Sequence, residues 1–269
     1  MQVSRIACTF PGKFGDLLWA LPTVRAISET YDQPVNLILS DYLAPMVDLM
    51  NEQPYIQQAV SYPVWQIELS APVSPRVPPS EFNFDRIFHL GLRGWPTLSL
   101  PREILGLAEK QTPIKPETFD LGRPWITVQG AAHPVGLVVG FTDEHFELKV
   151  GLTTLLQIDE RWAGCVIAPQ GSRWATERPV GGYPLHECGW LEAARLIRNA
   201  DKFLGCCSAL HVLSIAMGKP TVVMEPNEHR WHPIFWPNEV GDRVHLVLGN
   251  DNRPTFDARA VRQAIEKFL

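Results

Sequence analysis

The sequence predicts an α/β protein with parallel sheets, in which two halves are joined by a linker. Two observations favour this class. Short apolar runs typical of buried strands alternate with the periodic patterns of helices, and prolines at 113, 116, 124 and 134 interrupt this alternation. Since each proline removes a backbone donor, residues 111–134 are expected to form a linker or crossover. We therefore expect an N-terminal domain of residues 1–115 and a C-terminal domain of residues 116–269.

The first half begins with an apolar strand and continues with alternating helices and strands. Pro22 lies inside the first helical pattern, so that helix either is kinked there or begins there. Residues 72–80 are rich in proline and are expected to form a loop. The expected elements, in order, are strand 4–10, helix 16–31, strand 34–40, helix 42–52, strand 56–62, strand 84–92 and helix 101–110.

The second half resumes the alternation after the proline-rich stretch. Its expected elements, in order, are strand 135–141, helix 152–158, strand 164–170, helix 190–200, strand 201–207, helix 208–218, strand 219–226 and helix 257–269. Strands that alternate with helices in this way form parallel sheets covered by helices. Ligands of such sheets bind at the carboxyl ends of the strands, so the loops at those ends are where a site is expected.

The composition is that of an ordinary globular protein. With 20% charged residues and a formal net charge of -5, the chain shows no broad basic footprint for nucleic acid. No apolar run approaches the roughly 18 residues of a membrane span. The N-terminal apolar run is too short for a signal peptide, and we expect a cytoplasmic protein. The cysteines fit no zinc-binding spacing, and Cys8 and Cys165 are expected to be small core residues.

A glycine-rich loop with a carboxylate follows the first strand. After the apolar run that ends at Phe10 come Gly12 and Gly15, and Asp16 opens the helical pattern. Glycines allow a backbone to approach a sugar or phosphate without a Cβ in the way. A purely structural interpretation of Asp16 is that it caps the helix, since aspartate is favoured at N-caps and in first turns.

Three segments resemble one known family and occur in its order. Residues 14–27, 84–94 and 190–226, which include "FGDLLWALPTVRAI", "FDRIFHLGLRG" and "CCSALHVLSIAMGKP", resemble the bacterial lipopolysaccharide heptosyltransferases of glycosyltransferase family 9. This resemblance implies the GT-B fold, two Rossmann-like domains whose parallel sheets face a central cleft. It also implies inverting transfer from a nucleotide-sugar without a metal. The chain departs from the family at Cys207, where an acidic residue is usual, and at Val212, where a histidine is usual.

The resemblance places the acceptor on the N-terminal half. An inverting transferase needs a base that takes the proton of the attacking hydroxyl, and the resemblance gives this role to Asp16. The acceptor-side loop is expected to comprise Gly12, Lys13 and Gly15, with Arg93 facing the acceptor from a later loop.

The donor is expected to bind the C-terminal half. Without a metal, the charge of a leaving diphosphate is stabilised by helix N-termini, backbone amides and cations. The small-residue turn and helix start at Ser208, Ala209, Leu210 and His211 fit this need, although Ser208 also suits a plain N-cap. Further candidates for donor and phosphate binding are Thr142, Lys149, Glu225 and Arg230.

The resemblance, together with these residues, implies a hexosyl- or heptosyltransferase-like enzyme. It would need no cofactor or metal, and it would move a sugar from a nucleotide-sugar donor to a glycan or another hydroxyl acceptor. Two alternatives stay open: a phage-type DNA-base glycosyltransferase, and a non-catalytic nucleotide-sugar-binding module. The sequence lacks the G-x-S-x-G motif of serine hydrolases and the phosphate-binding loop motif of ATPases.

Overall fold

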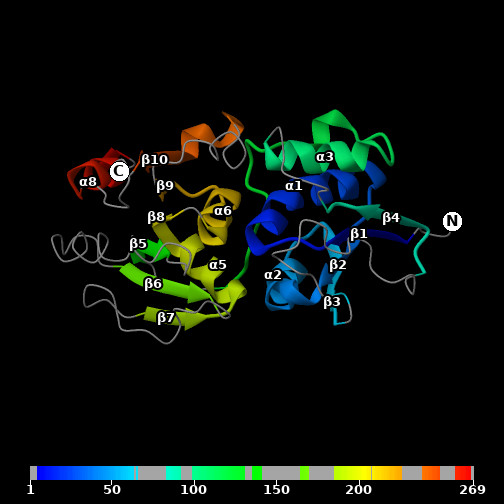
Figure 1. The fold of residues 1–269 in the computed structure, drawn as a ribbon, viewed down its shortest axis with the longest axis horizontal. Coiled ribbons are helices and arrows are strands. Elements are labelled where there is room, and N and C mark those ends of the chain that lie inside the picture. The colour runs from blue at the N-terminus through cyan, green and yellow to red at the C-terminus, as the bar shows by residue number, and fades with distance from the viewer. Residues whose placement is uncertain are drawn as a thin grey trace. The chain divides into compact units, whose positions relative to one another are not determined.

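The chain forms two compact units, and it passes from the first to the second between Thr127 and Val128. The computed structural model (Figure 1) describes residues 5–63, 65, 83–91, 99–130, 135–140, 164–169, 185–206, 208–225, 238–248 and 258–267. The loop expected at 72–80 and the helix expected at 152–158 lie outside these residues. Within them, no helix is long and apolar enough to cross a lipid bilayer.

The first unit contains a parallel sheet with the strand order β3-β2-β1-β4. The strands and helices expected from the sequence are found, with the second helix starting as a 3-10 turn. The elements are β1 (Ile6–Phe10), α1 (Phe14–Tyr31), β2 (Val35–Ser40), η1 (Asp41–Met46), α2 (Val47–Asn51), β3 (Ile56–Tyr62), β4 (Arg86–His89), α3 (Leu100–Glu109) and η2 (Pro116–Thr118).

The core of the first unit lies around the central strand β1. All five of its residues are buried, as expected for a parallel strand flanked by neighbours and covered on its faces. Helices α1 and α3 pack together (Figure 1), and the Tyr31 ring of α1 lies 6.1 Å from the Phe88 ring of β4. Cys8 is buried in this core, which confirms its expected role.

Helix α1 continues through Pro22, so the interpretation that it begins at Pro22 is wrong. Proline has no backbone N–H, and the carbonyl four residues earlier, that of Leu18, therefore loses its usual helical donor. The buried indole of Trp125 takes that place, donating from Nε1 to the Leu18 oxygen at 3.0 Å. Trp125 of the proline-rich stretch thus supplies the hydrogen bond that Pro22 removes from α1.

The proline-rich stretch is bound to the first unit by side chains that reach its main chain. Arg25 of α1, only 6% exposed, donates to the carbonyl oxygens of Pro124 at 3.0 Å and of Asp120 at 2.5 Å. The Tyr55 hydroxyl donates to the Trp125 carbonyl at 2.5 Å. Residues 120–125 of the expected linker are therefore packed against the first unit and hydrogen-bonded to it.

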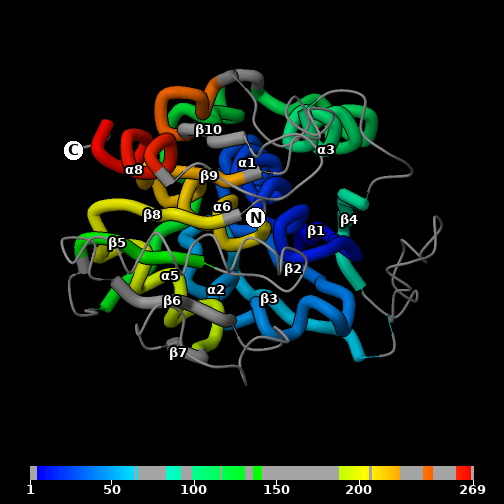
Figure 2. Tube along the Cα trace, turned by 60° about the vertical axis from the view of Figure 1, so that its left-hand side comes forward, coloured from blue at the N-terminus to red at the C-terminus, as the bar shows by residue number. Residues whose placement is uncertain are grey.

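The second unit contains a parallel sheet with the strand order β10-β9-β8-β5-β6-β7. Figure 2 shows β9, β8 and β5 side by side, and the ladder continues from β5 to β6 and from β6 to β7. Strands β7 and β10 were not expected from the sequence. The elements are β5 (Val135–Gly140), β6 (Gly164–Pro169), β7 (Leu185–Cys188), α5 (Trp190–Asn199), β8 (Ala200–Cys206), α6 (Ala209–Ala216), β9 (Thr221–Glu225), η7 (Asn238–Arg243), β10 (Val244–Leu248) and α8 (Ala258–Lys267).

Candidate functional site

Each sheet has one point at which the order of its strands reverses. The chain runs from β1 outward through β2 to β3 and then returns past β1 to β4; likewise it runs from β5 through β6 to β7 and then returns past β5 to β8. Ligands of open parallel sheets bind beyond the carboxyl ends of the strands at such reversals. The ends of β1 and β4, and those of β5 and β8, are therefore the two candidate binding positions, one in each unit.

The predicted base Asp16 lies close to the end of β1. It is the third residue of α1 and is half-buried, while Lys13 occupies the N-cap position without a side-chain capping hydrogen bond. A carboxylate in the first turn is favoured by the positive end of the helix dipole. Asp16 is thus a first-turn residue rather than the N-cap, and this placement agrees with either a catalytic or a helix-stabilising carboxylate.

Gly12 in the same loop has a structural reason to be glycine. A Cβ at this position would lie 2.6 Å from Cε1 and 2.8 Å from Cζ of the Phe10 ring, and 3.5 Å from the Asp16 Cβ. The Phe10 ring therefore occupies the space that any larger residue would need. Close approach of a ligand to Gly12 stays a prediction, as do the acceptor-side roles of Lys13 and Gly15.

His89, at the ends of β1 and β4, was not among the site residues predicted from the sequence. His89 is the last residue of β4 and pairs with Thr9 of β1, and the His89 Nδ1 and Thr9 Oγ1 atoms are hydrogen-bonded at 2.9 Å. Thr9 is fully buried and His89 is half-buried. Burial lowers the pKa of the His89 imidazole below its ordinary value, which favours the neutral ring. A histidine at the end of an apolar strand was the available signal.

Two paired glycines lie at the ends of β5 and β8 in the second unit. Gly140 of β5 pairs with Gly205 of β8, and the Phe203 ring lies against both. A Cβ at Gly140 would lie 2.6 Å from the Phe203 Cζ, and one at Gly205 would lie 2.8 Å from its Cε1. The glycines thus accommodate an aromatic ring at the base of the position where the donor was expected.

The predicted donor turn begins helix α6 beside these strand ends. Ser208 is the N-cap residue, and its backbone N–H donates to Nδ1 of His211 at 2.7 Å. The two residues take the positions of a capping box, yet the buried Ser208 Oγ makes no hydrogen bond of ordinary geometry with the described residues. Because the His211 Nδ1 accepts a hydrogen bond, the neutral ring carries its proton on Nε2.

The other predicted site residues are less informative. Ala209 and Leu210 form the first turn of α6, and Glu225 is the last residue of β9. Those that lie outside the described residues are Arg93, Thr142, Lys149 and Arg230. The structure therefore brings Ser208, Ala209, Leu210 and His211 together at one helix start.

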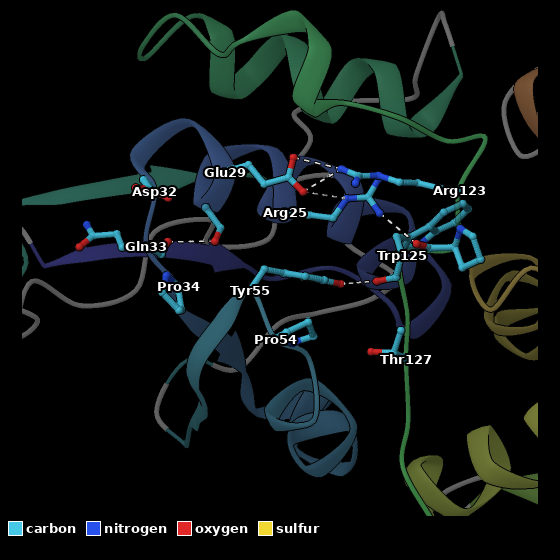
Figure 3. A pocket seen from close by; sticks show the side chains of 12 residues that line it. Arg25, Glu29, Asp32, Gln33, Pro34, Pro54, Tyr55, Arg123, Trp125 and Thr127 are labelled. Carbon is cyan, nitrogen blue, oxygen red and sulfur yellow. Dashed lines mark hydrogen bonds and ion pairs between the residues drawn. The ribbon is translucent and has the colours of Figure 1, made fainter.

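A separate hollow of about 470 Å³ lies on the first unit (Figure 3). Figure 3 shows Glu29 next to Arg25 and Arg123, and Tyr55 pointing to Trp125. Glu29 is about 20 Å from Asp16 along α1, at 1.5 Å per residue. The hollow thus lies away from the strand ends, and its charged side chains Arg25, Glu29 and Arg123 bind one another, while Arg25 and Tyr55 also bind the linker carbonyls.

No group of three or more histidine, cysteine, aspartate or glutamate side chains that could hold a metal occurs among the described residues. Cys8 and Cys188 are both buried, and burial raises the pKa of the Cys8 thiol. A buried thiol of raised pKa is a poor nucleophile, because the reactive form is the thiolate. The described residues therefore offer carboxylate, imidazole and helix-terminus chemistry.

The two parallel sheets, each with a strand-order reversal, agree with the expected GT-B fold, and the likeness to solved structures of that fold shows it. The chain is similar to the glycosyl transferase family 9 structure from Veillonella parvula DSM 2008, at 10% identity and a TM-score of 0.70, with 100% of this chain and 98% of that chain covered. It is also similar to E. coli heptosyltransferase WaaC with ADP, at 14% identity, a TM-score of 0.67 and coverage of 98% and 100%.

A third similar structure is the E. coli ADP-heptose lps heptosyltransferase II, at 12% identity and a TM-score of 0.65, with 98% of this chain and 99% of that chain covered. At these identities the likeness shows the fold. No family model matches the sequence, and no curated protein matches it significantly.

Proposed function

We propose that the protein is an inverting glycosyltransferase that moves a sugar from a nucleotide-sugar to an acceptor hydroxyl. The observation that carries this proposal is the pairing of two strand-order reversals in a GT-B fold, one next to the carboxylate of Asp16 and one next to the start of α6. The first position offers a base and the second offers groups that bind an anion. Inverting transfer needs both.

Asp16 would accept the proton of the attacking hydroxyl. Its position in the first turn of α1 holds the carboxylate at the carboxyl end of the sheet, where ligands of open parallel sheets bind. As a carboxylate, it can take a proton as the hydroxyl oxygen forms its bond to the anomeric carbon. The resulting loss of charge on Asp16 offsets the charge that the leaving diphosphate gains.

The diphosphate of the donor would bind at the start of α6. Backbone N–H groups of the first turn lack helical partners, and the helix dipole favours negative charge there. Ser208 adds a hydroxyl that faces the His211 backbone N–H in the capping box and makes no hydrogen bond of ordinary geometry with the described residues, and its O–H can donate to a phosphate oxygen. We further propose that these groups stabilise the leaving group without a metal ion.

Binding and chemistry can be tested separately. A thermal-shift screen over nucleoside diphosphates and nucleotide-sugars should reveal the donor, because a ligand of the native state raises the midpoint. If no member of a broad panel shifts the midpoint, the proposal fails. Binding without transfer to any acceptor would instead support the non-catalytic module.

The assignment of Asp16 is tested by Asp16→Asn. Asparagine keeps the shape of the side chain but accepts a proton poorly, so transfer should fall about 100- to 10,000-fold. Donor affinity and the thermal midpoint should stay near the wild-type values, since the donor is assigned to the second unit. Near-native turnover by this variant would contradict the role of Asp16.

The metal independence is tested by chelation. Transfer should be unchanged after treatment with EDTA, because protein groups take the role of the ion at the diphosphate. Loss of transfer that magnesium or manganese restores would refute this part of the proposal.

A further inference from the structure

His89 stands where the first sheet reverses its strand order, next to the end of β1 that leads to the Asp16 loop. Its ring is fixed through Nδ1 by the hydrogen bond to Thr9 Oγ1, at 2.9 Å. The anchoring hydroxyl is fully buried, so its position is set by the core of the sheet. A histidine held through one nitrogen is free to use the other nitrogen for a ligand in a defined orientation.

The backbone of His89 is fixed as well. β4 is the last strand of the sheet formed by the described residues, so the outward N–H and carbonyl groups of His89 have no neighbouring strand. The Gln111 side chain supplies both partners: its Oε1 accepts from the His89 N–H at 3.2 Å, and its Nε2 donates to the His89 oxygen at 3.4 Å. The ring and the backbone of His89 are thus each held by a side chain from outside β4, the ring by Thr9 and the backbone by Gln111.

The Nε2 atom of His89 makes no hydrogen bond with the described residues, whereas every other polar atom of this residue is accounted for. The side chain is half-buried, and it lies on the same face of the sheet as Ala7 and Ile87, two residues back along β1 and β4. A residue that is held firmly at a ligand-binding edge and presents one unused polar atom is what a preorganised binding site requires.

We propose that His89 is an acceptor-binding residue, whose Nε2 hydrogen-bonds a hydroxyl of a carbohydrate acceptor at the ends of β1 and β4. The inference rests on the proposed function for the class of ligand. A neutral imidazole suits this task, because it can donate to or accept from a hydroxyl according to its tautomer. Thr9 and Gln111 are positioning residues that act through His89.

The test uses the full chain with histidines labelled with ¹³C in the ring, titrated with a panel of methyl glycosides of hexoses and heptoses. The His89 ring signal is identified by its loss in His89→Asn. Saturable displacement of this signal by a methyl glycoside is expected. If no glycoside displaces the signal, or if binding leaves it unmoved, the inference is refuted.

Two matched variants separate contact from structure. The Asn amide of His89→Asn still reaches the Nδ1 position and Thr9 but lacks a group at Nε2, whereas the longer Gln amide of His89→Gln reaches toward Nε2. We expect His89→Asn to weaken binding of the glycoside about tenfold, the equivalent of one hydrogen bond, and His89→Gln to recover part of the loss. Equal affinity of His89→Asn and the wild type would refute the contact.

Nucleotide-sugar binding, followed by thermal shift on the same samples, distinguishes this inference from the proposed function. If the protein binds a nucleotide-sugar but glycosides leave the His89 signal unchanged, the acceptor contact alone is refuted. In a protein whose His89 responds to glycosides while no nucleotide-sugar binds, the contact is supported and the transferase is refuted.

Discussion

Replacement of Trp125 by phenylalanine should destabilise the protein mainly because a carbonyl oxygen of α1 loses its hydrogen-bond donor. The indole N–H is the donor to Leu18 O, at 3.0 Å, and Pro22 prevents the helix from supplying a donor itself. Both Leu18 and Trp125 are buried, at 0% and 1% exposure. A buried carbonyl left without its partner costs about 1–3 kcal/mol, to which the smaller ring adds lost packing against Trp19.

A double-mutant cycle with Pro22→Ala isolates the hydrogen bond. Alanine restores an N–H that can donate to Leu18 O within the helix, so Trp125→Phe should cost about 1 kcal/mol less in that background. The packing loss is common to both backgrounds and cancels. Urea unfolding followed by circular dichroism gives the four free energies, with Trp125→Phe alone as the reference. Equal cost in both backgrounds would refute the idea that the indole substitutes for the missing helical donor.

Two further predictions concern packing and pH. Gly205→Ala should lower the free energy of unfolding by about 1–3 kcal/mol, because its Cβ would overlap the Phe203 ring. Gly106→Ala in α3, where no atom lies within 4 Å of the new Cβ, should raise it by about 0.5–1 kcal/mol. Urea unfolding of both variants gives these values, and an unchanged stability of Gly205→Ala would contradict the packing. Since burial lowers the folded-state pKa of His89, the unfolded chain binds more protons below about pH 6.5, and stability should fall as pH drops through that region. Thermal midpoints from pH 7.5 to 5 should decline less in His89→Gln than in the wild type, and parallel declines would contradict this.

The fold follows largely from the periodic patterns of the sequence. Buried parallel strands read as continuous apolar runs, which is why β1 and β2 were located correctly. Strand β7 was missed because "LHEC" is short and half polar, and β10 because "VHLVL" follows a segment without a clear pattern. Such strands are defined by pairing with a neighbour, which is a tertiary effect that local sequence does not encode.

Prediction of the site was less complete for a similar reason. Asp16 and Ser208 could be proposed because each stands where a strand gives way to a helix, a feature visible in the sequence. His89 and Thr9 are 80 residues apart, and only the register of β1 against β4 brings them together. The glycine at 12 was assigned to ligand approach, while its contact with the Phe10 ring required the structure.

Gln111 has a consequence for the behaviour of the protein at high concentration. An edge strand with open N–H and carbonyl groups is a template on which a strand of another molecule can pair and start aggregation. Alternate residues of a parallel strand face the same neighbour, so Ile87 and His89 of β4 turn their backbone groups outward, and the Gln111 amide pairs with both groups of His89. Because β4 spans only Arg86–His89, pairing at His89 leaves an incoming strand the backbone groups of Ile87 alone within β4. The amide that orients His89 thereby also shortens the part of this edge on which another molecule could pair.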